Sequence, residues 1–220
     1  VGWEHEYFLN PDLIRFTETY PDFDIKEVTA YAKQKGVQLI GHNETFGGVY
    51  NYENQLPDAF EFYQKYGVHA VKTGYVHPKL NGEELHTSQY GVQHYRKVLE
   101  LAAKHQIMIN NHEPAMPSGL RRTYPNLMTQ EGVRGQEYDA WSTDGGNPPD
   151  HTTIVPFTRG LAGPMDFTFG TFNFENSKLE GTRVQTTIAK QLALYVVIYS
   201  PMQMASDLPE SYSGNKAFNF

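Results

Sequence analysis

Short apolar segments alternate with amphipathic stretches along this chain, and the alternation predicts βα units joined in a mainly parallel sheet. Successive strand-like segments begin near residues 37, 69 and 107, a spacing typical of such units. The predicted strands are Val37–Gly41, His69–Gly74, Ile107–Asn111, Val133–Tyr138, Pro164–Thr168 and Met202–Ser206.

Four stretches have the 3.6-residue apolar period of helices. The first begins after Asp24, which is placed to cap free N–H groups, and Glu27 occupies the third helical position as in a capping box. The other predicted helices are Tyr52–Tyr66, Val92–His105 and Val184–Tyr199. The last is apolar over most of its circumference, so we expect it to be deeply buried.

The predicted fold class is α/β, a TIM-like (β/α)8 barrel that is incomplete in this chain. Eight such units take about 250 residues, and the chain offers six strands plus the tail of another at Val1–Glu4. We therefore expect residues 1–220 to form one barrel segment that starts inside the barrel.

Composition and charge remove several classes of partner. The chain has 18 basic and 25 acidic residues and a net charge of -7, with no Lys/Arg-rich run, so we expect no nucleic acid and no anionic membrane surface. Membrane insertion is not expected either, because no apolar run approaches the roughly 20 residues of a membrane helix. Cysteine is absent, which excludes disulfides, thiolate metal sites and a Cys nucleophile.

Two further features of composition leave alternatives open. Aromatic residues make up 14% of the chain, which suits both a Tyr-rich core and a surface that stacks on sugar rings. The sequence opens at Val1 with neither an initiator Met nor a signal peptide, and we expect it to be a piece of a longer protein.

Carboxylates follow three of the predicted strands at the point where each strand ends. Glu44 follows the first strand, Glu113 the third, and Glu137 lies at the end of the fourth; His42 and His112 precede the first two. Since the active site of a (β/α) barrel is built at the carboxyl ends of its strands, we expect these side chains to meet there.

Clustered carboxylates suit glycoside hydrolysis, in which one protonates the leaving oxygen while another, ionised, activates water or attacks the sugar. Glu131, six residues before Glu137, adds a further acid. Carboxylates without Cys favour a hard cation such as Ca²⁺. Zinc bound by His42 and His112 is the alternative, but no His-x-His or HExxH pair supports it, and sugar hydrogen bonding is the better interpretation of these histidines.

Eight runs, in this order, resemble the catalytic barrel of glycoside hydrolase family 97, and together they span almost the whole chain. They are His42–Thr45 (HNET), Val71–Tyr75 (VKTGY), Asn111–Glu113 (NHE), Arg122–Leu127 (RTYPNL), Arg134–Tyr138 (RGQEY), Pro156–Arg159 (PFTR), Gly163–Asp166 (GPMD) and Gln191–Tyr195 (QLALY). The resemblance implies a calcium-dependent bacterial α-glucosidase or α-galactosidase acting on oligosaccharides.

The resemblance also implies a role for each matched position. Glu137 matches the general acid, and Glu44 and Glu113 match the carboxylates that activate water in the inverting branch. The implied calcium ligands are Glu113, Glu131 and Glu137, and the residues implied around the glucose subsite are His42, Lys72 and His112.

One position separates the two branches of the family. The retaining branch has an Asp nucleophile at the strand end where this chain has Gly74, so the resemblance implies inversion, with catalytic carboxyl groups roughly 6.5–9.5 Å apart. Asn43 departs from the family's first motif, which often carries a second His there.

The resemblance also concerns what surrounds the segment. Members of the family have an N-terminal β-sandwich, earlier barrel strands and a C-terminal β-domain, and we expect these flanking domains as partners of the segment. It implies a periplasmic or extracellular location.

The leading expectation is an inverting, calcium-dependent α-glucosidase that releases glucose from the non-reducing end of α-linked gluco-oligosaccharides. Several alternatives stay open. A retaining α-galactosidase, a non-catalytic carbohydrate-binding barrel and, less favoured, a metal-dependent amidohydrolase are the other functions considered. Asp166 and Asp207 close the last two predicted strands, either to bind sugar hydroxyls or as buried hydrogen-bonded carboxylates. The turn-rich loop from Asp144 to Pro149 is interpreted as a surface lid rather than a metal loop.

Overall fold

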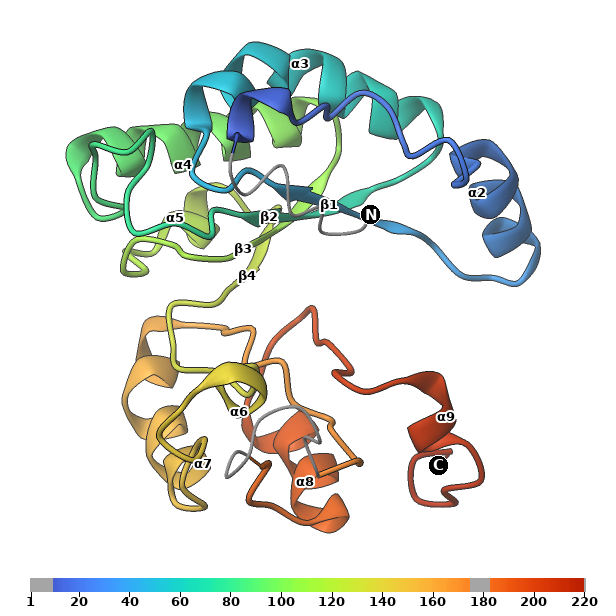
Figure 1. The fold of residues 1–220 in the computed structure, drawn as a ribbon, viewed down its shortest axis with the longest axis vertical. Coiled ribbons are helices and arrows are strands. Elements are labelled where there is room, and N and C mark those ends of the chain that lie inside the picture. Colours follow the sequence, from blue (N-terminus) through green and yellow to red (C-terminus); the bar gives the residue numbers. More distant parts are fainter. Residues whose placement is uncertain (1–9, 175–182, 220) are drawn as a thin grey trace. The chain divides into compact units, whose positions relative to one another are not determined.

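The computed structural model describes residues 10–174 and 183–219 (Figure 1). The chain divides into two compact units, Val1–Gln130 and Glu131–Phe220. The strand tail predicted at Val1–Glu4 lies outside the described residues. No helix of the described part is long and apolar enough to cross a membrane.

The first unit is built on a parallel sheet. Its strands are β1 (Ile40–Glu44), β2 (Ala70–Gly74), β3 (Met108–Asn111) and β4 (Leu127–Gln130), and they are hydrogen-bonded in the order β1-β2-β3-β4. The predicted α/β class and parallel pairing are therefore confirmed. The sheet is open among the residues described, and β1 and β4 are its edges.

Three long helices connect or precede these strands: α2 (Ile25–Gln34), α3 (Val49–Lys65) and α4 (Gln89–Lys104). The predicted cap is present, since Asp24 accepts a hydrogen bond from the Glu27 amide at 3.0 Å. Figure 1 shows α3 and α4 on the same face of the sheet. The short helices η1 (Pro11–Leu13) and α5 (Leu120–Thr123) complete the unit.

The core of the first unit lies between this helical layer and the sheet. Tyr52, Leu56 and Phe60 of α3 have no exposed surface, and they pack in one cluster with Val71 of β2 and Ile109 of β3. Burial of such side chains contributes about 1.5–3 kcal/mol each, so this cluster holds the strand ends in place.

The second unit is mainly helical: α6 (Tyr138–Trp141), α7 (His151–Ile154), η2 (Val155–Phe157), η3 (Arg159–Ala162), α8 (Ile188–Val197) and α9 (Pro209–Tyr212). Its core contains Met165, Phe167 and Phe169 packed against Leu194 and Ile198.

Three predicted strands are wrong for the described residues. The ranges 133–138, 164–168 and 202–206 form no strand. The Gln136 amide donates singly to the Phe167 carbonyl, and the Ser206 amide donates singly to the carbonyl of Phe169, just beyond the second range. Without a repeated ladder of such bonds, extended backbone does not become a strand.

One strand was missed, and the first strand is shifted from its predicted range. The strand β4 was missed, because Leu127–Gln130 alternates buried and half-buried positions and includes the polar residues Thr129 and Gln130. The first strand begins at Ile40 rather than Val37, because the Val37 amide donates to the Ala32 carbonyl and so closes the end of α2.

The predicted deep burial of the last long helix is also wrong. In α8 the buried residues are Gln191 and Leu194, while Val196 is 83% exposed. One side of α8 packs on the Phe167–Phe169 cluster, and no described residue covers the opposite side.

Candidate active site

The ends of β1, β2 and β3 lie level with one another. Glu44 is paired with Gly74, Thr73 is paired with Asn111, and the His112 amide donates to the Thr73 carbonyl. The residues that follow the three strands therefore emerge at the same edge of the sheet, as parallel strands require. This edge brings together the first two carboxylates that the sequence singled out, Glu44 and Glu113.

Glu44 is held by the backbone. Its Oε1 accepts hydrogen bonds from the Phe46 amide at 2.8 Å and from the Val76 amide at 2.9 Å. Burial raises the pKa of Glu44, although both amides act in the opposite direction. A carboxylate with a raised pKa, fixed in orientation, suits the transfer of a proton to or from water.

Gly74 leaves the space that Glu44 fills. A Cβ added to Gly74 would lie 1.9 Å from Glu44 Oε2 and 3.4 Å from His42 Nε2. Because the first distance is far below van der Waals contact, no side chain fits at position 74 while Glu44 keeps this conformation.

Glu113 is held from the neighbouring strand end. Its Oε2 accepts from the Tyr75 amide at 2.7 Å, and its carbonyl accepts from the Tyr95 hydroxyl at 2.9 Å. Its backbone has φ 45°, in the left-handed region that non-glycine residues seldom adopt. Such backbone costs on the order of 1–3 kcal/mol and concentrates at functional sites.

The predicted sugar-binding residues of the first unit lie beside these carboxylates. His42 is paired with Lys72 across β1 and β2. Burial, and then the charge of Lys72, lowers the pKa of His42 to about 3, so this imidazole is neutral at pH 7. Its 3.9 Å approach to Glu44 Oε2 is therefore not an ion pair. His112 is 3% exposed.

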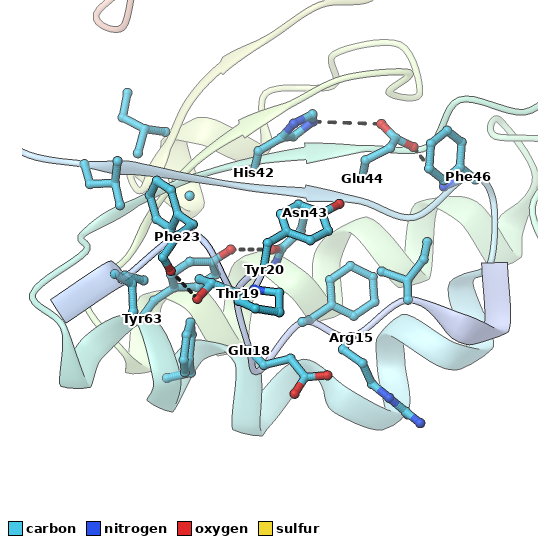
Figure 2. A pocket seen from close by; sticks show the side chains of 18 residues that line it. Arg15, Glu18, Thr19, Tyr20, Phe23, His42, Asn43, Glu44, Phe46 and Tyr63 are labelled. Atoms are coloured by element: carbon cyan, nitrogen blue, oxygen red, sulfur yellow. Dashed lines mark hydrogen bonds and ion pairs between the residues drawn. The ribbon is translucent and has the colours of Figure 1, made fainter. Parts of the chain in front are cut away.

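A cavity of about 300 Å³ lies beside β1 (Figure 2). Apolar side chains of residues 14–25, among them Phe16 and Phe23, line it together with His42 and Glu44. Two of the predicted site residues are therefore reachable from this cavity.

The second unit carries the other two predicted acids. Glu131 is buried, Glu137 is half-buried at the start of α6, and each offers a carboxylate oxygen within 4.8 Å of the other. Two carboxylate oxygens this close are suited to binding a hard cation between them.

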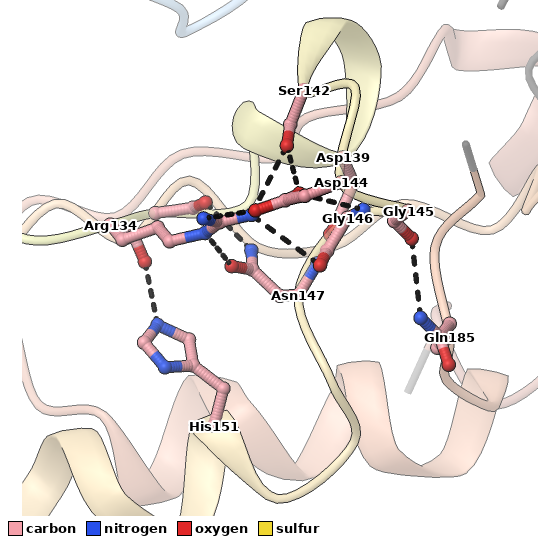
Figure 3. Close-up of polar contacts among 10 residues, drawn as sticks. Arg134, Asp139, Ser142, Asp144, Gly145, Gly146, Asn147, His151 and Gln185 are labelled. Atoms are coloured by element: carbon pink, nitrogen blue, oxygen red, sulfur yellow. Dashed lines mark hydrogen bonds and ion pairs between the residues drawn. The ribbon is translucent and has the colours of Figure 1, made fainter. Parts of the chain in front are cut away.

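The backbone leading to Glu137 is tied down by several hydrogen bonds (Figure 3). The Gly135 carbonyl accepts from the Asn147 side chain at 2.9 Å, and the Arg134 carbonyl accepts from His151 Nε2 at 2.8 Å. The Arg134 guanidinium pairs with both oxygens of Asp144 at 2.8 Å. Asp144 thus anchors the loop that the sequence analysis interpreted as a lid.

Glu131 is positioned through its main chain. The Arg159 guanidinium donates to the carbonyls of Glu131, Gly132, Gly163 and Pro164 at 3.0–3.3 Å. Arg159 therefore joins the segment of Glu131 to the segment that precedes Asp166. Asp166 itself is 2% exposed and accepts from the Thr168 hydroxyl, which fits the buried, hydrogen-bonded alternative.

Sequence reasoning missed the residues that hold these acids. The amides of Tyr75 and Val76 bind the two carboxylates of the first unit, and Arg159 binds the main chain at Glu131. The sequence signal that could have identified Tyr75 and Val76 is their position directly after the end of a predicted strand. Arg159 ends the run Pro156–Arg159, but its role was not predicted, because its partners are backbone carbonyls that no sequence pattern identifies.

Comparisons with known proteins identify relatives along almost the whole chain. A glycoside hydrolase family 97 enzyme from Pseudoalteromonas sp. strain K8, solved in complex with panose and in complex with acarbose, is 52% identical, with a TM-score of 0.90 over 99% of this chain and 35% of that one.

Two curated proteins are more distant. A retaining alpha-galactosidase from Bacteroides thetaiotaomicron is 29% identical, and a probable retaining alpha-galactosidase from Streptomyces bingchenggensis is 30% identical. Each match covers 96% of this chain and 30% of the relative, so the chain spans about a third of the length of the proteins it resembles.

The family model for glycoside hydrolase 97 matches residues 1–133, which include β1 to β4 and the carboxylates Glu44 and Glu113. With more than half of the chain matched by this model, the chain belongs to glycoside hydrolase family 97.

Proposed function

We propose that this chain is the catalytic barrel segment of an inverting, calcium-dependent α-glucosidase that releases glucose from the non-reducing end of α-linked oligosaccharides. The observation that carries the proposal is the lack of room for a side chain at position 74. A Cβ added there would lie 1.9 Å from Glu44 Oε2. While Glu44 keeps this conformation, a nucleophilic side chain does not fit at position 74, so the proposed attacking group is water.

The proposed roles follow from how each carboxylate is held. Glu44 and Glu113, fixed by the amides of residues 76 and 75, accept the proton of the attacking water. Glu137 protonates the glycosidic oxygen as the bond breaks. His42, kept neutral, and Lys72 hydrogen-bond sugar hydroxyls, with His112 as a further sugar contact.

The chemistry of the acids fits a calcium site. Glu131 and Glu137 bring two carboxylate oxygens within 4.8 Å, and hard oxygen ligands of this kind suit Ca²⁺. We extend the ligand set to Glu113 on the family resemblance. A bound cation would supply positive charge near the leaving oxygen.

Glucose is favoured over galactose by the degree of similarity. The enzyme bound to panose and acarbose is 52% identical to this chain, whereas the retaining alpha-galactosidases are 29–30% identical. A retaining α-galactosidase is the second candidate, and position 74 weighs against it.

The remaining proposals concern the surroundings of the segment. We propose that it works within a longer protein whose flanking domains complete the barrel and cover the site, and that this protein is periplasmic or extracellular. An oligosaccharide is the proposed partner.

Hydrolysis by the full-length protein tests the substrate proposal. We expect glucose release from maltose and panose and a much lower kcat/KM on 4-nitrophenyl α-galactoside than on 4-nitrophenyl α-glucoside. A preference for the galactoside would favour the second candidate, and binding of maltose without any release would favour a carbohydrate-binding role.

A further inference from the structure

A buried polar chain lies behind the two carboxylates of the first unit. His94, on α4, is 2% exposed, and its Nδ1 lies 2.7 Å from Glu53 Oε1 on α3. Its Nε2 lies 3.0 Å from the hydroxyl of Tyr75, which has no exposed surface. At the outer end, Lys97 donates to Glu53 Oε2 at 2.5 Å.

The direction of each hydrogen bond in this chain is fixed by protonation. Burial lowers the pKa of His94, and the hydrogen bond from His94 lowers the pKa of Glu53 to about 2, so a neutral imidazole faces an ionised carboxylate. Glu53 can only accept, so Nδ1 of His94 carries the proton and Nε2 accepts from the Tyr75 hydroxyl. Such a second partner fixes the orientation of the ring.

Tyr75 connects this chain to the carboxylates. Its ring is packed edge-on against His94, Tyr52 and Tyr95, with centroids 5.2–6.4 Å apart. Its own amide donates to Glu113 at 2.7 Å, and the next amide, of Val76, donates to Glu44 at 2.9 Å. The ring and hydroxyl of one residue therefore anchor the two amides that hold the two acids.

We infer that Glu53, His94 and the Tyr75 hydroxyl form a positioning relay that sets the orientation of Glu44 and Glu113 through the backbone of residues 75–76. This inference rests on the proposed function, since it assigns the relay to the two residues that activate water. None of the three relay side chains is placed to touch substrate, so the relay acts on the rate of the chemical step and not on sugar binding.

Substitutions within the relay test it in the full-length protein. Tyr75→Phe removes the hydroxyl and keeps the ring, and His94→Leu removes both hydrogen bonds of the imidazole. His94→Gln offers one donor and one acceptor in their place. Tyr52→Phe is the matched control, because it removes an equally buried hydroxyl that accepts from Asn43, whose side chain keeps its bond from Tyr63.

The substrates are maltose and 4-nitrophenyl α-glucoside. We expect Tyr75→Phe and His94→Leu to lower kcat on both by about tenfold or more, because small misplacements of catalytic groups carry losses of this size. KM should stay within about twofold, and His94→Gln should retain more activity than His94→Leu. A fall of kcat on both substrates would indicate that the water-activating carboxylates are affected. Nitrophenol leaves without protonation by an acid, so a defect in the general acid alone would spare the nitrophenyl substrate.

Two results would overturn the relay. One is a wild-type kcat in Tyr75→Phe, and the other is an equal fall of kcat in Tyr52→Phe, which would reduce the effect to general destabilisation. If the wild-type protein releases no glucose, the proposed function fails instead. A crystal structure of Tyr75→Phe then still decides the relay, which requires longer Tyr75–Glu113 and Val76–Glu44 hydrogen bonds than in the wild type.

Discussion

Gly74 and Glu44 stand level on neighbouring parallel strands, and the carboxylate of Glu44 occupies the space where a side chain at position 74 would begin. A side chain at position 74 would therefore displace the Glu44 carboxylate from its observed position. In the proposed reaction, glycine at position 74 leaves room for Glu44 to act as the base, and the result is inversion of the anomeric configuration.

Gly74→Ala should reduce activity far more than stability. The colliding atom is the far end of the Glu44 side chain, which can swing away at a cost of about 1 kcal/mol, within the range for modest overpacking. The swing breaks its bonds to the amides of Phe46 and Val76, so we expect kcat to fall by about a hundredfold. Denaturant unfolding and maltose hydrolysis measure the two effects.

A double-mutant cycle shows whether the clash with Glu44 causes the destabilisation by Gly74→Ala. In a Glu44→Ala background, Gly74→Ala should no longer destabilise the protein, because the colliding carboxylate is gone. Equal destabilisation in both backgrounds would mean that position 74 is restricted by something other than Glu44.

Kinetics of the Glu137→Gln variant should distinguish the role of a general acid from that of a general base. Loss of a general acid lowers rates by roughly 10²–10⁴-fold, and we expect this loss on maltose. The loss should be smaller on 4-nitrophenyl α-glucoside, whose leaving group needs little protonation. Steady-state kinetics on the two substrates provide the measurement, and an equal loss on both would assign Glu137 a different role.

Calcium should bind to the protein and raise its melting temperature. A ligand at a hundred times its Kd stabilises the folded state by about 2.7 kcal/mol. Glu131→Gln should weaken Ca²⁺ binding in calorimetric titration, since one of the two close carboxylates is lost. Glu61→Gln, which alters an exposed residue of α3, is the control. Unchanged affinity in Glu131→Gln would contradict the proposed site.

The pairing of Glu53 with His94 predicts a loss of stability in acid. Hydrogen bonding from His94 lowers the pKa of Glu53 to about 2, whereas the unfolded chain takes up this proton near pH 4.5. The stabilisation is therefore present above about pH 5 and is lost as the pH falls toward 2. Melting temperatures of the wild type and Glu53→Gln should converge over this range, and a constant difference would contradict the pairing.

Much of the first unit could be predicted from its sequence. Asp24 and Glu27 mark a helix start by a local hydrogen bond, and the apolar period of α3 and α4 reflects the face that each helix buries. The end of β3 was predictable for the same reason, because Glu113 follows a run whose Ile107 and Ile109 are buried in the core.

The second unit was less predictable because its backbone conformation depends on contacts between residues far apart in the sequence. The segment 133–138 was predicted to be a strand, yet its backbone bonds go singly to residue 167 and to side chains such as Asn147. The Tyr75–His94–Glu53 chain was missed for a related reason. Its three members lie on three elements, and only the packed fold brings them together.

The anomer first released from maltose tests the central claim most directly. We expect proton NMR of maltose hydrolysis by the full-length protein to show β-glucose first, which later converts to the equilibrium mixture. The reason is that, in the proposed mechanism, water attacks the sugar directly at a site with Gly74 beside Glu44. Release of α-glucose first would show retention and contradict the account.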